Sequence, residues 1–216
     1  MRDYCLTISK KGKAKFISHL DLYRALERAL RRSFLPISFT EGYNPHPKIS
    51  FLTALELGAT SDCEKAIITL KEPLPSHQIK ERLNRFLPNG IRIEDVSQLN
   101  KKGIIADSTL FILTIILPTE VKREALEEAI KKFLEAPSFP MKREQKGKTK
   151  EINLKDFVRD LKLRDFQPSK ASLELLVSLT PYGSAKPREV VEALQSFLPQ
   201  MKLVQVHRAN LFVKEK

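Results

Sequence analysis

The sequence has few of the residues on which most metal, redox and disulfide functions depend. Its 216 residues include two cysteines, Cys5 and Cys63, four histidines and no tryptophan. Two isolated cysteines cannot build a disulfide framework or a thiolate cage, so we expect both to be reduced and packed. The H-x-x-H, C-x-x-C and H-E-x-x-H spacings and glycine-rich phosphate loops are absent as well. We therefore predict no metal, no cofactor and no catalytic residues.

Long apolar runs are also missing. No run approaches the ~20 residues that a membrane-spanning helix requires. The N-terminus enters a strand pattern directly, where a signal peptide would have an apolar stretch. These absences predict a cytoplasmic protein that does not contact a membrane.

Acidic residues are the minority among the charged side chains. The chain has 38 Lys and Arg against 26 Asp and Glu, a formal net charge of +12. Such an excess raises the local concentration of polyanions, which include RNA, DNA and acidic protein surfaces. The net charge by itself does not choose among these partners.

A chain of this length is long enough for one large domain or two small ones. Hydrophobic periodicity predicts the order β-α-β-β-α-β for the first half, with a loop of restricted shape, rich in Gly, Asn and Pro, at 40–48. The expected strands are 3–10, 49–57, 64–70 and 91–96, and the expected helices are 19–33 and 75–87.

The second half repeats this order with a basic, hairpin-like interruption at 142–150. Its expected strands are 109–117, 171–180 and 203–213, and its expected helices are 119–134 and 187–198. We predict an α+β protein of two tandem ferredoxin-like (βαββαβ) modules, residues 1–102 and 103–216. A single continuous domain with a mixed sheet remains the alternative.

The most informative segment is 10–32, where eight basic residues accompany two acidic ones, a local net charge of +6. Ser18 and Asp21 have the spacing of a capping box at the start of a helix. The arginines that follow are three and four residues apart and share one helix face, opposite Leu22, Leu26, Ala29 and Leu30. They are Arg24, Arg28, Arg31 and Arg32. Guanidinium groups on such a face bind phosphate oxygens, whereas the alternative is a solvated face partly neutralised by Asp21.

A second basic stretch lies in the predicted interruption. Its cations are Lys142, Arg143, Lys146, Lys148 and Lys150. A lysine-rich loop can follow a phosphate backbone, or it can serve only as a polar connector. In the loop 40–48, Tyr43 offers a ring that could stack on a base or fill a core.

The histidines do not form a recognisable catalytic set. Ser18, His19 and Asp21 fall within one helical turn, where Ser18 and Asp21 are better used as caps than as a hydrolytic triad. His19 could act as a general base in RNA cleavage or hydrogen-bond the loop 40–48. His46, between Pro45 and Pro47, is either a positioned contact residue or part of a rigid turn.

Several long strings resemble a bacterial and archaeal family known as radical SAM-associated, or radical SAM-linked, proteins. The strings are FISHLD (16–21), ERALRR (27–32), GYNPHPK (42–48) and the L-x-L-G turn (55–58). The resemblance implies that Ser18, His19 and Asp21, Arg28, Arg31 and Arg32, and the residues from Asn44 to Lys48 occupy a shared surface. Tyr43 stands where Phe would equally be expected.

The resemblance implies an association with radical SAM proteins and with ribonucleases of the E/G type, hence a setting in RNA processing or modification. The chain lacks the C-x-x-x-C-x-x-C spacing that holds the cluster of a radical SAM enzyme. We predict a non-enzymatic RNA-binding accessory protein. The alternatives are a protein-docking subunit of a radical SAM enzyme and a metal-independent ribonuclease that uses His19 or His46. The predicted RNA- or partner-binding residues are Lys13, Lys15, His19, Arg24, Arg28, Arg31, Arg32, Tyr43, Asn44, His46, Lys48, Lys142, Arg143, Lys146 and Lys148.

Overall fold

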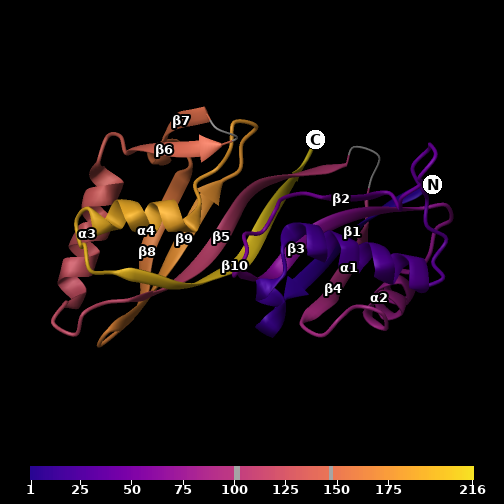
Figure 1. The fold of residues 1–216 in the computed structure, drawn as a ribbon, viewed down its shortest axis with the longest axis horizontal. Helices are drawn as coiled ribbons and strands as arrows, with labels where there is room; N and C mark the ends of the chain where they lie inside the picture. The colour runs from indigo at the N-terminus through magenta and orange to yellow at the C-terminus, as the bar shows by residue number, and fades with distance from the viewer. Residues whose placement is uncertain (100–102, 146–147) are drawn as a thin grey trace. The chain divides into compact units, whose positions relative to one another are not determined.

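The computed structural model describes residues 1–99, 103–145 and 148–216. These residues form a mixed α/β structure with four α-helices and a large β-sheet (Figure 1). The chain divides into two compact units: unit 1 contains residues 1–106 and 208–216, and unit 2 contains residues 107–207. None of the helices in the described ranges is both long and apolar enough to cross a membrane.

Unit 1 has the element order β-α-β-β-α-β, with a short 3-10 helix after the first strand. Its strands lie in the order β4-β1-β3, and β2 also pairs with β3; every one of these pairings is antiparallel. The elements are β1 (Arg2–Lys10), η1 (Gly12–Phe16), α1 (His19–Arg32), β2 (Ile49–Phe51), β3 (Thr60–Leu70), α2 (Ser76–Asn84) and β4 (Ile91–Gln98).

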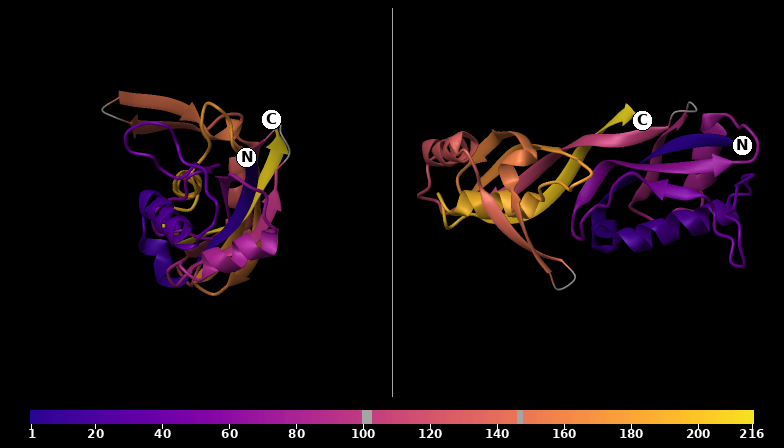
Figure 2. Two further views of the ribbon diagram at one scale, coloured as in Figure 1. Left: turned by 90° about the vertical axis from the view of Figure 1, so that its right-hand side faces the viewer. Right: turned by 90° about the horizontal axis from the view of Figure 1, so that it is seen from above.

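The core of unit 1 lies between one face of this sheet and the helices α1 and α2 (Figure 2). Alternate residues of β1, which are Tyr4, Leu6 and Ile8, are all at most 1% exposed and belong to this core. The two-residue period of a strand places them on one face, as the sequence predicts. From α2, Ile79 and Leu83 pack into the same core. Both cysteines are buried and unbonded to each other, and burial is the main cause that raises the pKa of Cys63 to about 11.

In unit 2 the strands lie in the order β10-β5-β9-β8, and β6 and β7 form a separate antiparallel hairpin. The elements are β5 (Ile104–Ile116), α3 (Arg123–Glu135), β6 (Pro140–Gln145), β7 (Lys148–Asn153), η2 (Leu154–Asp156), β8 (Val158–Gln167), β9 (Lys170–Ser178), α4 (Pro187–Gln195) and β10 (Lys202–Glu215). The apolar stripes of the two helices are buried; they consist of Leu126, Ala129, Ile130 and Phe133 on α3 and Val190, Val191, Ala193 and Leu194 on α4. The hairpin-like character predicted for 142–150 is confirmed for the described residues, since 142–145 pair with 148–151.

The sequence pattern did not reveal strand β8. Register shifts interrupt its pairing with β9 between Val158 and Asp160 and again between Leu163 and Asp165. Each bulge adds a residue and reverses the alternation of apolar and polar side chains, so a strict two-residue period is lost. The strand predicted at 49–57 was too long, because β2 ends at Phe51 and the following residues form a loop.

A buried ion pair links strands β3 and β10 in unit 1. Arg208, from the middle of β10, places Nη1 2.9 Å from both carboxylate oxygens of Glu64 on β3. The same guanidinium donates to Oγ1 of Thr53 at 2.9 Å and to the carbonyl oxygen of Ala54 at 3.0 Å. Arg208 is 4% exposed and Glu64 0% exposed. The pair therefore joins residues 144 positions apart in the sequence inside a region without water contact.

Removing one partner of this pair should be strongly destabilising. Arg208→Met leaves the Glu64 carboxylate buried without its counter-charge, and we expect a loss of about 3–5 kcal/mol in the free energy of unfolding. The double variant Arg208→Met/Glu64→Leu removes both charges of the pair and should recover much of that loss. Urea denaturation of the three proteins measures both effects. A single variant that is as stable as the wild type would contradict the buried pair.

Candidate nucleic-acid interface

The first turn of α1 begins with the predicted capping box. Oγ of Ser18 accepts a hydrogen bond from the backbone N–H of Asp21 at 3.1 Å, and Oδ2 of Asp21 accepts from the hydroxyl of Ser18 at 2.7 Å and from its backbone N–H at 3.4 Å. These hydrogen bonds hold the pKa of Asp21 below its usual value. Both side chains are therefore engaged in starting the helix and not in a hydrolytic triad.

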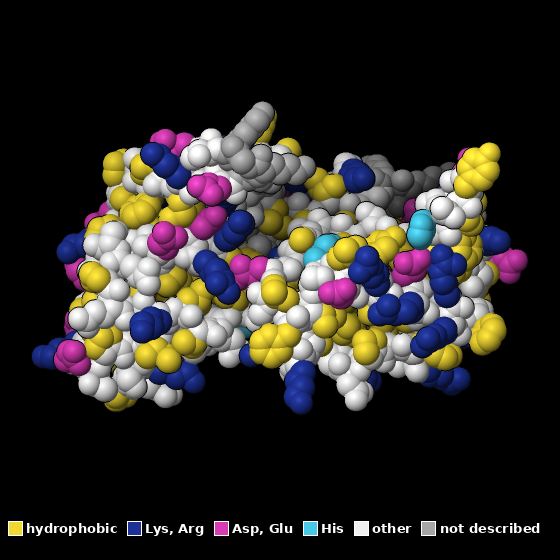
Figure 3. Space-filling model, in the orientation of Figure 1, with side chains coloured by type: hydrophobic (Ala, Val, Ile, Leu, Met, Phe, Trp, Pro, Cys, Tyr) yellow, Lys and Arg dark blue, Asp and Glu magenta, His cyan; other side chains and the backbone are white. Residues whose placement is uncertain are grey.

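Helix α1 has one buried and one cationic face. The buried face packs into the core of unit 1 and consists of Leu22, Ala25, Leu26, Ala29 and Leu30. On the other side of the helix, Arg24, Arg28, Arg31 and Arg32 are all exposed. Figure 3 shows Lys and Arg side chains gathered over this helix. We refer to the four arginines as the arginine face.

The four guanidinium groups differ in their partners. Arg24 lies 3.7 Å from Asp21, in a solvent-exposed pair. Within the described part of the chain, neither Arg28 nor Arg32 makes a hydrogen bond or an ion pair. An exposed guanidinium without a carboxylate partner keeps all its donors for a ligand.

Arg31 instead fastens the loop 40–48 to the helix. Its Nη2 lies 3.1 Å from Oε1 of Glu27 and donates to the carbonyl oxygen of Pro45 at 3.2 Å. Its guanidinium also stacks on Phe39, with the central carbon 5.3 Å from the ring centroid. Nδ1 of His46 lies 3.1 Å from the same glutamate oxygen. Glu27 thus joins helix and loop, a role that composition did not indicate.

The environment of Glu27 favours its charged form. Burial of the side chain, which is 17% exposed, raises its pKa. The hydrogen bonds from His46 and Arg31 act in the opposite direction and outweigh burial, so the pKa lies below the usual 4.5. The carboxylate is therefore ionised at neutral pH and can hold both partners.

The loop is also closed at its base. The backbone N–H of Thr40 donates to the carbonyl oxygen of His46 at 2.8 Å, and the N–H of His46 donates to Oγ1 of Thr40 at 3.0 Å. Between them, Gly42 has φ of +119°, which side chains rarely adopt. Tyr43 stands at the tip and is fully exposed. The loop consequently presents Tyr43 and Asn44 to solvent on a fixed base.

Phe34 is a second exposed aromatic residue, and it follows the C-terminal end of α1. It follows the C-cap Ser33 with φ of +53° and is 88% exposed. A left-handed residue after a helix is usually Gly or Asn, because a side chain at this φ is strained. No local sequence pattern singled out Phe34, because its exposure and its left-handed backbone are properties of the folded chain.

The remaining predicted residues of unit 1 have several different environments. Lys13 is exposed, and Lys15 lies over the ring of Phe16, with Nζ 5.0 Å from the centroid. Lys48 is half-buried, and its backbone N–H donates to the carbonyl oxygen of Ser38 at 2.8 Å. The structure brings His46 together with the arginine face through Glu27, whereas Lys48 lies at the base of the loop.

His19 is half-buried, and its ring meets that of Phe51 edge-on at 5.0 Å between centroids. Nδ1 is buried, and no residue in the described ranges hydrogen-bonds it. Burial is the main cause that lowers its pKa below the usual 6.5; Glu64 opposes this effect, while Arg208 and Lys10 add to it. A general base usually has its second ring nitrogen oriented by a hydrogen bond, and His19 lacks this feature.

In unit 2, one of the predicted basic residues is exposed and another is held in an ion pair. Lys142 is exposed on β6. Arg143 forms a bidentate pair with Glu189 of α4, at 2.6 and 2.5 Å, and donates to the carbonyl oxygen of Ser184 at 2.6 Å. It therefore holds the hairpin against α4. Lys146 and the side chain of Lys148 lie outside the described residues.

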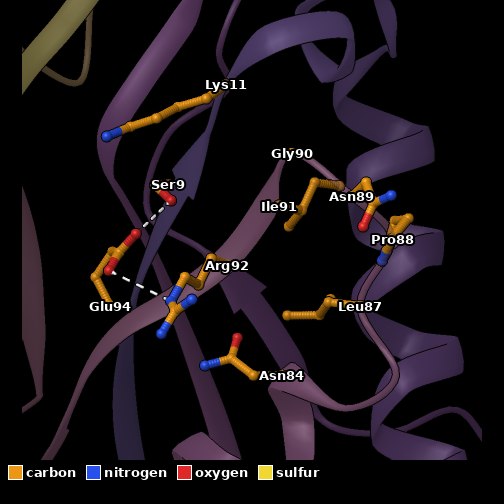
Figure 4. Close-up of a pocket in the computed structure, with 10 residues that line it drawn as sticks. All are labelled: Ser9, Lys11, Asn84, Leu87, Pro88, Asn89, Gly90, Ile91, Arg92 and Glu94. Carbon is orange, nitrogen blue, oxygen red and sulfur yellow. Dashed lines mark hydrogen bonds and ion pairs between the residues drawn. The ribbon is translucent and has the colours of Figure 1, made fainter.

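A hollow of about 340 Å³ near the start of β4 is a second candidate site (Figure 4). Several of its polar side chains already have partners. Ser9 donates to Glu94 at 2.6 Å, and Arg92 lies 3.9 Å from the same carboxylate. The side chain of Asn84 exchanges hydrogen bonds of 3.0 and 2.8 Å with the backbone of Ile93. With these partners already made, the hollow offers fewer ready donors than the arginine face.

Comparisons with known proteins identify a family and a fold. Residues 4–187 match the model of a family described as "Uncharacterized protein conserved in bacteria (DUF2344)". No curated protein has a matching sequence. The description of the family mentions no radical SAM protein, so that expected association stays a prediction.

Two solved structures illustrate the similarity of fold. A crystal structure of a Cbf5-Nop10-Gar1 complex matches with a TM-score of 0.61 and 7% identity, over 96% of this chain and 48% of the other. An H/ACA RNP bound to a substrate RNA containing 2'-deoxyuridine matches with a TM-score of 0.53 and 8% identity, over 96% and 47%. The chain thus spans about half the length of these proteins. At such identities the likeness concerns the fold alone.

Loss of the Glu27 carboxylate should release the loop from α1. In Glu27→Gln we expect the amides of Thr40 and Lys48 to exchange with solvent about fivefold faster, because one charged hydrogen-bond acceptor worth ~1 kcal/mol is lost. Glu81→Gln, which changes an exposed glutamate of α2, is the matched control. In the wild type, the same protection should be lost as the pH falls through the lowered pKa of Glu27, below about 4.5. Unchanged exchange in Glu27→Gln would refute the fastening role.

Stability should also depend on His19. Its pKa is lowered on folding, so below about 6.5 the unfolded chain binds more protons than the native protein. We expect the free energy of unfolding to fall as the pH drops from 7 to 5, and to fall less steeply in His19→Gln. Denaturation across this range measures the slopes; equal slopes would show that His19 does not titrate differently in the two states.

Proposed function

Because the chain belongs to the DUF2344 family of uncharacterized proteins conserved in bacteria, whose description names no activity, we propose from the site itself that it binds RNA. The contact is made by the arginine face of α1 together with the loop 40–48. In this proposal the protein holds RNA without cleaving it and presents it to a partner enzyme.

The observation that carries the proposal is the exposure of Arg28 and Arg32 without carboxylate partners within the described residues. They are four residues apart on a helix whose opposite face is buried in the core, so their spacing is fixed. Guanidinium groups at a fixed spacing bind phosphate oxygens in pairs at a smaller entropic cost than a flexible tail. The net charge of +12 supplies the long-range attraction.

The loop contributes an additional set of contacts. Arg31 and Glu27 fasten it to α1, which leaves Tyr43 and Asn44 exposed at its tip. A phosphate backbone bound on the helix would have these side chains within reach of its bases. Asn supplies a donor and an acceptor for base edges, and Tyr supplies a ring.

A protein of similar fold occurs in a complex with RNA, which supports the proposal. The H/ACA RNP structure is described as bound to a substrate RNA, and the fold that it shares with this chain covers 96% of the chain. With 8% identity the likeness does not carry over any contact residue. The arginine face of this chain, and not the likeness, therefore supplies the argument for RNA.

We also propose that each unit is a ferredoxin-like module. Unit 1 has the order β-α-β-β-α-β, and unit 2 has the same order when the β6–β7 hairpin is set aside. The strand orders β4-β1-β3-β2 and β10-β5-β9-β8 correspond position by position. In such a module both helices cover one face of the sheet, which makes α1 a stiff support for a binding face.

The test is RNA binding at two salt concentrations. The probe is an RNA hairpin that carries single-stranded tails, and the variant is Arg28→Gln/Arg32→Gln. We expect weaker binding and a salt slope smaller by about 1.4, since two phosphate contacts at ~0.7 each are lost. Fluorescence anisotropy measures the affinity, and circular dichroism checks the fold.

The matched control is Arg85→Gln/Arg92→Gln, which removes the same number of guanidinium charges from the α2 and β4 region of unit 1. Both variants have a net charge of +10, two below the +12 of the wild type. If both weaken binding equally, the attraction depends on net charge and the arginine face is not the site. If the wild type does not bind, the RNA proposal is wrong and a protein partner with an acidic surface takes its place.

A further inference from the structure

We propose that the RNA held by the arginine face is single-stranded, and that Phe34 and Tyr43 are the platforms on which its unpaired bases stack. This inference rests on the proposed function and specifies its substrate class. It adds Phe34, which no sequence pattern indicated, to the binding surface.

Phe34 carries the first part of the argument. Its backbone has a φ of +53°, in the left-handed region, and its ring is 88% exposed. An aromatic residue at this position is strained, and exposure means that little packing compensates for the strain. Asn or Gly would fit the same backbone better. A strained, exposed ring directly after Arg31 and Arg32 is explained if the ring meets a ligand.

Tyr43 carries the second part. It is the most exposed large hydrophobic residue among the described residues, with its whole ring in solvent. The loop that carries it is nevertheless fastened, through the hydrogen bond from Arg31 to the carbonyl oxygen of Pro45 and the hydrogen bonds between Thr40 and His46. A ring held on a fixed support loses little conformational freedom when it stacks on a base. Exposure without mobility at the base of the loop is what a stacking platform needs.

The arrangement of charges and rings favours single strands over duplexes. Arg28, Arg31 and Arg32 lie on the last turns of α1, Phe34 follows them in the chain, and the loop of Tyr43 is bound to Arg31. Phosphates on the arginines thus leave rings available for the attached bases. In an A-form duplex the bases are stacked on one another and cannot reach a protein ring, whereas unpaired bases can.

The ring of Phe16, which is 68% exposed, differs from these two. It belongs to η1, which precedes α1 in the chain, and has the ammonium of Lys15 over one face, 5.0 Å from the centroid. That face is therefore occupied. Phe34 and Tyr43 have no cation or aromatic partner within the described ranges, so their rings are open for stacking.

The experiment compares oligouridine with an RNA duplex of the same length, at one salt concentration, for four proteins. They are the wild type, Phe34→Asn, Tyr43→Ala and Tyr43→Phe. We expect the wild type to bind oligouridine more tightly than the duplex. Phe34→Asn and Tyr43→Ala should each weaken oligouridine binding about fivefold or more, the effect of losing one stacked base. Tyr43→Phe keeps the ring and should bind like the wild type.

Thermal unfolding separates loss of stacking from loss of fold. Asn tolerates the left-handed conformation, so the midpoint of Phe34→Asn should equal or exceed that of the wild type while its affinity falls. Equal affinity of the wild type for both RNAs, or an unchanged affinity in Phe34→Asn, would overturn the inference. If Arg28→Gln/Arg32→Gln still weakens binding in that case, the proposed RNA function survives. Equal binding of polyglutamate would overturn both, in favour of an acidic protein partner.

Discussion

The arrangement of unit 1 depends on a pair of charges with little access to water. Glu64 and Arg208 come from β3 and from the middle of β10, and each satisfies the other in a region where an isolated charge would be prohibitively costly. The same guanidinium also donates to Oγ1 of Thr53 and to the carbonyl oxygen of Ala54. A little further along the same loop, the backbone N–H of Gly58 donates to the carbonyl oxygen of Lys15 at 2.8 Å. The pair therefore positions the loop that packs against the segment leading into α1.

The start of α1 is coupled to the same region. Lys10 is 1% exposed, and its ammonium donates to the carbonyl oxygen of Ile17 at 3.0 Å, one residue before the helix cap. The charges of Glu64, Arg208 and Lys10 also act on His19, in the first turn. The interactions of buried charged groups thus position the N-terminal end of the helix, while apolar packing determines which face of the helix is buried. The direction in which the arginines point follows from both.

The arginines show that one residue type can serve opposite purposes within a single chain. Arg208 is structural and buried, and Arg143 fastens a hairpin to α4 through Glu189. Arg31 fastens the loop of Tyr43, whereas Arg28 and Arg32 make no ion pair within the described residues. What separates these roles is the presence of a carboxylate within hydrogen-bonding distance. The proposed binding face is therefore a small subset of a strongly basic composition.

Local patterns in the sequence determined the helices, most strands and the capping box, because each depends on neighbours a few residues away. They also placed the four arginines on one face of α1, as the structure has them. They did not reveal β8, whose bulges interrupt the alternation, or the short extent of β2. The mixed α/β class could be predicted, and charge and spacing indicated the candidate site residues of 24–48.

The tertiary structure alone decided which charges are committed and which are free to bind. Glu27 became a link between helix and loop, Glu64 found Arg208 from 144 residues away, and Phe34 emerged as a strained, exposed ring. None of these features has a local signal, since a salt bridge depends on the distance between side chains brought together by the whole fold. Exposure is likewise a property of the packed chain. The sequence by itself determined where the positive charge lies along the chain, and only the fold decided which of it remains available to a ligand.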